Sequence, residues 1–143
     1  TQWILSRQLH HEETQYDIAL RLRADSIDSL NQAEIRKILK EHGFPKKTEV
    51  GTSACEAAWI IIQHAPLDVQ KEYLPMLERA ATEGNIQAAL VAALHDRIDV
   101  REGRPQKYGT QRNRNGICPL LNKKMVNQWR KEVGLPPLDE YSK

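Results

Sequence analysis

Cysteine is scarce in this sequence of 143 residues, which has only Cys55 and Cys118. Two cysteines make neither a disulfide framework nor a zinc-binding set. Long hydrophobic runs are missing too, because the longest block, AAWIII at 57–62, is far shorter than the ~20 residues of a membrane span. The first residues, TQWILSRQLHHEET, lack the apolar centre of a signal peptide. We therefore expect no membrane partner, while the sequence leaves the compartment open.

An excess of charge of one sign is also absent, since 21 basic and 19 acidic residues leave a formal net charge of +2. This balance argues against strong electrostatic binding to nucleic acid. The sequence has no glycine-rich phosphate loop, nucleophile elbow or His-Glu-x-x-His motif. The HHEE group at 10–13 has no second cluster at metal-ligand spacing, so we interpret it as a solvated helix face. We expect no nucleic-acid partner, no metal and no organic cofactor.

The pattern of apolar residues along the chain is helical. It predicts one compact all-α domain over residues 1–143, built from about six helices. A polar loop or short β-hairpin is expected near residues 106–120, because NRNG at 113–116 has the composition of a tight turn. Residues 131–143 are expected to be partly an extended tail.

Several polar residues predict where these helices begin. The first helix is expected over about 1–23, with DSID at 25–28 interrupting the pattern. Asn31 followed by Glu34, and Ser53 followed by Glu56, have the form of capping boxes and predict two helix starts. Asn85 is expected to cap a further apolar helix.

Two of the predicted helices are apolar on nearly all sides and then end in polar residues. One ends in Gln63 and His64, and the other carries Asp96 and Arg97 near its end. Buried polar groups without partners cost about 1–3 kcal/mol each, so these side chains need donors and acceptors. The stretch QKYGTQ at 106–111 offers both. We expect it to fold over the helix ends and to join one polar network with them.

This network has two interpretations. In the structural one, the polar side chains cap helix ends and satisfy the backbone of the loop. In the functional one, they form a ligand or catalytic pocket in which His64 transfers a proton, Asp96 orients it and Arg97 holds negative charge. Gln106, Tyr108 and Gln111 would then position the substrate.

Two long segments resemble a bacterial domain family of unknown function. They are VGTSACEAAWIIIQHAPLDVQKEYLPMLERA and ALHDRIDVREGRPQKYGTQ, and the resemblance covers about residues 17–141. The family pattern has Gln-His after a buried helix, then Asp-Arg, then G-x-x-Q-x-Y-G-T-Q; it also has Gln after an early Asp, where this chain has Ile18. The resemblance implies a helical domain whose family residues are Asp28, Asn31, Gln63, His64, Asp96, Arg97, Gln106, Tyr108, Thr110 and Gln111.

Three functional hypotheses follow. The first is a small cofactor-independent enzyme that uses acid–base chemistry, hydrolysis or group transfer, on a polar substrate. The second is a non-catalytic module that binds a small polar ligand, a peptide, a glycan or a partner protein through the same surface. The third is a polar network that only stabilises the fold. The resemblance carries no assigned reaction, and the oligomeric state stays open.

Overall fold

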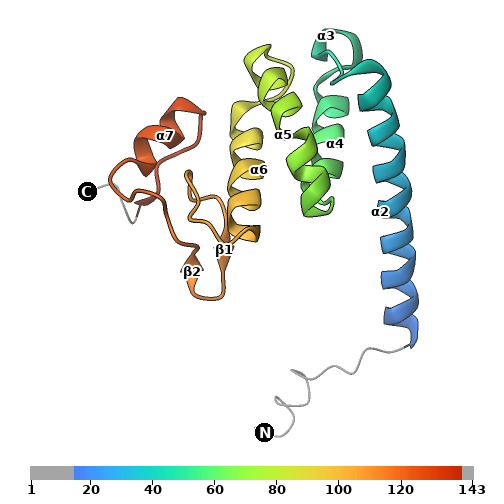
Figure 1. Ribbon diagram of the computed structural model, residues 1–143, viewed down its shortest axis with the longest axis horizontal. Coiled ribbons are helices and arrows are strands. Elements are labelled where there is room, and N and C mark those ends of the chain that lie inside the picture. Colours follow the sequence, from blue (N-terminus) through green and yellow to red (C-terminus); the bar gives the residue numbers. More distant parts are fainter. Residues whose placement is uncertain (1–14, 140–143) are drawn as a thin grey trace, which may run out of the picture.

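The computed structural model describes residues 15–139, and side chains from residue 19 onward. Within this part of the chain, six helices and one small hairpin confirm the predicted all-α class. The elements are α2 (Gln15–His42), α3 (Lys47–Val50), α4 (Thr52–Gln63), α5 (Leu67–Thr82), α6 (Ala88–Arg101), β1 (Arg112–Asn113), β2 (Gly116–Ile117) and α7 (Val126–Glu132). Figure 1 shows α2 at one edge of the molecule, the hairpin and α7 at the other, and α4, α5 and α6 between them. The HHEE group and most of the expected first helix lie outside the described residues.

The helix α2 is one continuous element, so the predicted interruption at DSID is wrong. No glycine or proline occurs between residues 15 and 42, and exposed Asp and Ser side chains weaken a helix only slightly. Asn31 consequently lies inside α2 and does not cap a second helix. Only the C-terminal half packs on the core, through Ile35 and Leu39. The N-terminal half extends past the neighbouring helices and exposes apolar side chains such as Leu30 (Figure 1).

Two other predicted helix starts are also wrong. The residue before α4 is Gly51, and no side chain caps that helix, so Ser53 has no capping role. The helix α6 begins after Gln87, not after Asn85. The side chain of Asn85 instead accepts a hydrogen bond from the backbone amide of Lys47, at 3.0 Å. Asn85 therefore stabilises the start of α3, an element that the sequence pattern did not predict.

The core lies where α4, α5 and α6 meet the C-terminal half of α2. Its fully buried members include Ile62 from α4, Leu77 from α5 and Leu94 from α6. Pro75 stands within α5 without dividing it. Both α4 and α6 run in one direction with α5 antiparallel to them (Figure 1). Their C-terminal ends, which carry the predicted polar residues, consequently lie at one end of the molecule.

The predicted turn at 113–116 is confirmed. The strands β1 and β2 pair antiparallel, with Asn113 opposite Gly116. Cys118 continues this pairing by donating its amide to Gln111 O at 3.1 Å. Both cysteines are buried and free. None of the helices that the structure describes is both long and apolar enough to cross a membrane.

Candidate functional site

The carboxylate of Asp96 anchors the 106–111 stretch to α6. Its Oδ1 accepts the backbone amides of Lys107 and Tyr108, and its Oδ2 accepts the amide and the hydroxyl of Thr110, all at 2.9 Å. Asp96 is completely buried, and an acceptor of four hydrogen bonds is well satisfied there. The stretch therefore does fold onto the end of a buried helix, and its backbone amides supply three of the four donors.

Gln106 holds the other side of the same loop and is also completely buried. Its Nε2 donates to Gln111 O at 2.9 Å and to Cys118 O at 3.0 Å, while its Oε1 accepts the amide of Gln111 at 2.9 Å. Gln106 also forms a parallel bridge with Leu120. These contacts show that Gln106 joins the loop to the hairpin.

Arg130 of α7 fixes this loop from outside, in a role that the sequence pattern did not predict. Its Nη1 donates to Tyr108 O at 2.7 Å, and its Nε donates to Pro136 O at 2.6 Å. Burial lowers the pKa of the Arg130 guanidinium, while the charge of Asp96 acts in the opposite direction. Arg130 is 22 residues from its partner in the loop. An exposed-looking basic residue on a short helix gives no sequence signal of such a contact.

Two long side chains bridge α6 and the segment that comprises α4 and the residues just after it. The indole Nε1 of Trp59 donates to Leu90 O at 2.9 Å, and Arg101 Nη1 donates to Ala65 O at 3.0 Å. These contacts mark a stripe along α6, because residues three and four apart share a helix face. Arg97 lies on this stripe, one turn before Arg101. Arg97 is therefore held on the side of α6 that faces α4.

Two glutamines approach the same stripe. Gln63 is one turn after Trp59, so it lies on the face of α4 that contacts α6. Gln111 comes from the loop, and its Nε2 lies 3.5 Å from the carbonyl oxygen of Ala93, one turn before Arg97. Gln111 thus reaches α6 one turn before Arg97.

Gln63 and Arg97 both keep unused hydrogen-bonding atoms. Gln63 Oε1 and Arg97 Nε are buried, and neither has a hydrogen-bond partner in the described part of the chain. Burial lowers the pKa of the Arg97 guanidinium, and the positive charge of Arg101 lowers it further. Arg101 itself is occupied by Ala65 O and by Gln70 Oε1, the latter at 3.0 Å. Arg97 on α6 and Gln63 on α4 therefore each keep a buried polar atom that no residue of the described part of the chain satisfies.

His64 lies elsewhere on α4, on the side that faces α2. It is exposed and lines a hollow of about 100 Å³ together with Asp28 and Asn31. Three residues named by the family resemblance, from distant parts of the sequence, thus share one small space. Asp96 is not part of it, and no hydrogen bond joins Asp96 to His64 among the described residues. The expected orientation of His64 by Asp96 has no contact to support it.

Tyr108 lies on yet another side of α6. Its ring meets that of His95 edge-on, with centroids 6.3 Å apart, and both line a hollow of about 140 Å³. Residues two apart project to nearly opposite sides of a helix, so His95 and Arg97 point away from each other. The expected substrate-binding residues are consequently divided among three places around α4 and α6.

One group of side chains has the composition of a metal site. His95, Asp96 and Asp99 have ligand atoms within 4.8 Å of one another. However, Asp96 already accepts four hydrogen bonds, and Asp99 Oδ1 accepts two from Arg104, at 3.1 and 2.6 Å. His95 Nδ1 lies 3.2 Å from Asp99 Oδ2, within ion-pair distance but without hydrogen-bond alignment. A cation would have to displace protein donors from two of its three ligands, so the group fits a metal poorly.

Comparison with curated proteins and with solved structures finds no match to either. Residues 10–143 match the family of unknown function DUF6624, and because this match covers more than half of the chain, the chain belongs to that family.

Proposed function

We propose that the chain binds a small anionic polar ligand at the α4–α6 junction, with Arg97 as its anchor. The observation that carries this proposal is the unmet hydrogen-bonding capacity of Arg97 Nε and Gln63 Oε1. A buried N–H group of an arginine without an acceptor is unfavourable, and folding alone gives no reason to keep one there. A ligand that brings negative charge would remove that penalty on binding.

The two free atoms define what the ligand must carry. Arg97 requires an anionic oxygen, for which a carboxylate has the best geometry. Gln63 Oε1 requires a donor, such as a hydroxyl or an N–H group. A hydroxy acid, a sugar acid or an amino acid combines both. In this proposal Asp96, Gln106 and Thr110 do not touch the ligand, since they hold the loop that brings Gln111 to Ala93 on α6.

The replacement Arg97→Met tests the proposal. It removes a desolvated charge and keeps an unbranched apolar side chain at this position. The free energy of unfolding without ligand should therefore rise by about 1 kcal/mol. The same variant should lose ligand binding. A panel of malate, glucuronate, glutamate and sulfate is added while thermal unfolding is followed. We expect at least one carboxylate to raise the midpoint of the wild-type protein and not that of Arg97→Met.

Arg101→Met is the matched control. It removes the same charge one turn away, but Arg101 has partners in Ala65 O and the buried Gln70. Its loss should therefore lower the free energy of unfolding by about 1–2 kcal/mol. If Arg97→Met is destabilising to the same degree, Arg97 is a structural residue. If every anion raises the unfolding midpoint of the wild-type protein and of Arg97→Met equally, the anion site is not at Arg97.

Acid–base catalysis by His64 is the second candidate, and the hollow that it shares with Asp28 and Asn31 favours it. Asp28, not Asp96, is the carboxylate of this hollow. The hollow holds only a few atoms, which suits a reacting group more than a whole substrate. For any substrate that the wild-type protein turns over, His64→Gln should abolish turnover and preserve binding. Equal turnover by His64→Gln and the wild-type protein would exclude this role.

A further inference from the structure

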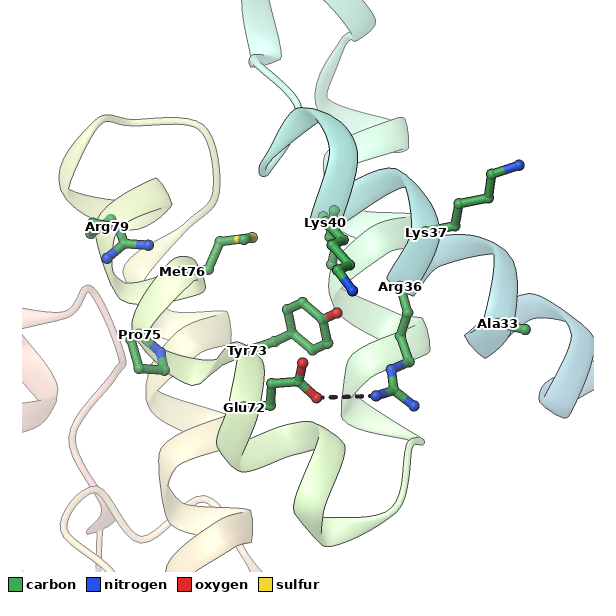
Figure 2. Close-up of a pocket in the computed structure, with 10 residues that line it drawn as sticks. Ala33, Arg36, Lys37, Lys40, Glu72, Tyr73, Pro75, Met76 and Arg79 are labelled. Atoms are coloured by element: carbon green, nitrogen blue, oxygen red, sulfur yellow. Dashed lines mark hydrogen bonds and ion pairs between the residues drawn. The ribbon is translucent and has the colours of Figure 1, made fainter.

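A large hollow lies between α2 and α5, away from Arg97, His64 and the 106–111 loop (Figure 2). Its volume is about 690 Å³, within the ~300–1,000 Å³ of small-molecule sites. We call it the α2–α5 cleft. The residues lining it are Ala33, Arg36, Lys37, Leu39, Lys40, Glu72, Tyr73, Pro75, Met76 and Arg79.

The cleft is rich in positive charge. Four of its side chains are basic and one is acidic, and that carboxylate, Glu72, already pairs with Arg36 at 3.2 Å. Figure 2 shows Lys37 directed away from the cleft, whereas Lys40 points across it toward Tyr73. Arg79 extends from α5 on the far side of Met76 from Lys40 (Figure 2). Lys40 and Arg79 therefore place positive charge at two separate points along the cleft.

Apolar atoms line the space between these cations. Met76 and Pro75 form the α5 wall, and the buried Leu39 and Tyr73 close the bottom. A fully hydrated inorganic ion would leave these surfaces in contact with water. An occupant with an apolar body would bury them and gain hydrophobic free energy in addition to charge pairing.

We propose that the α2–α5 cleft binds an organic anion, a carboxylate or phosphate carried on an apolar body. The anionic group pairs with Lys40, and the apolar body lies against Met76. This site is separate from the Arg97 site and does not depend on it.

The two methionines of the chain make a direct test possible. Met76 lines the cleft, whereas Met125 stands beside α7 at the opposite edge of the molecule. With ¹³C-methyl methionine, titration with octyl phosphate or octanoate should shift the Met76 signal saturably and leave Met125 unchanged. Inorganic phosphate should bind at least about tenfold more weakly, because it lacks the apolar body. Neutral octyl glucoside should leave Met76 nearly unshifted.

Charge variants complete the test. Lys40→Gln should weaken octyl phosphate binding about fivefold, near the upper limit for exposed ion pairs. Lys123→Gln and Arg114→Gln carry the same charge change on distant exposed residues and should have no effect. Arg97→Met should leave the Met76 titration unchanged, which separates this site from the proposed function. Equal weakening by the distant variants, equal shifts of both methionines, or a Met76 shift with octyl glucoside would each overturn the proposal.

Discussion

Asp96→Ala should lower the free energy of unfolding by about 3–5 kcal/mol. The replacement leaves three backbone amides and one hydroxyl of residues 107–110 without the acceptor that the buried carboxylate supplies. The loss should exceed that of most single substitutions, because all four donors share the one carboxylate. Urea unfolding measures the change. Hydrogen exchange should show that the amides of Lys107, Tyr108 and Thr110 lose protection first.

Two variants make this result interpretable. Thr110→Val removes one of the four donors and should lower the free energy of unfolding by only about 1 kcal/mol. His64→Ala changes an exposed side chain and should stay within about 0.5 kcal/mol of the wild-type value. If Asp96→Ala is no more harmful than Thr110→Val, the loop does not depend on Asp96. If His64→Ala is as harmful as Asp96→Ala, the two residues belong to one structural network after all.

The pairing of Asp96 with the polar loop could be predicted because it follows from local chemistry. A carboxylate on an apolar helix needs donors, and the stretch at 106–111 has many donors and little apolar surface to bury. The hairpin turn could be predicted for a similar reason, since Asn113 and Gly116 are typical turn residues. Neither prediction needs knowledge of distant parts of the chain.

The neighbours of each helix could not be predicted in this way. Helical periodicity identifies a buried face but does not say which helix covers it. It therefore could not show that His64 faces Asp28 while Asp96 faces the loop. The capping motifs failed for a different reason. Asn31 and Ser53 have the composition of caps, but helix α2 continues through one and α4 starts before the other. Asn31 does not cap a helix because α2 continues through it, with no glycine or proline nearby to end that helix.

Gly109→Ala is expected to be the most harmful substitution of a glycine in the described part of the chain. Gly109 has φ of 68°, a left-handed conformation that costs a residue with a side chain about 1–2 kcal/mol. A Cβ there would lie 2.8 Å from Leu138 Cδ1 and 3.1 Å from Leu120 Cδ2. Overpacking of this kind adds about 1–3 kcal/mol. Urea unfolding should therefore show a total loss of about 2–5 kcal/mol.

Gly103→Ala separates the two contributions to this loss. Gly103 has nearly the same backbone conformation, with φ of 75°, but a Cβ there would have no atom within 4 Å. It should suffer the backbone strain alone, about 1–2 kcal/mol. The additional loss of unfolding free energy in Gly109→Ala then measures how tightly Leu138 and Leu120 pack against residue 109. Truncation of the contacting side chain, Leu138→Ala, should make Gly109→Ala less harmful than it is alone, because the clash is removed. Equal losses for the two glycine variants would mean that the loop shifts to admit the methyl group, and that the C-terminal residues do not hold it in place.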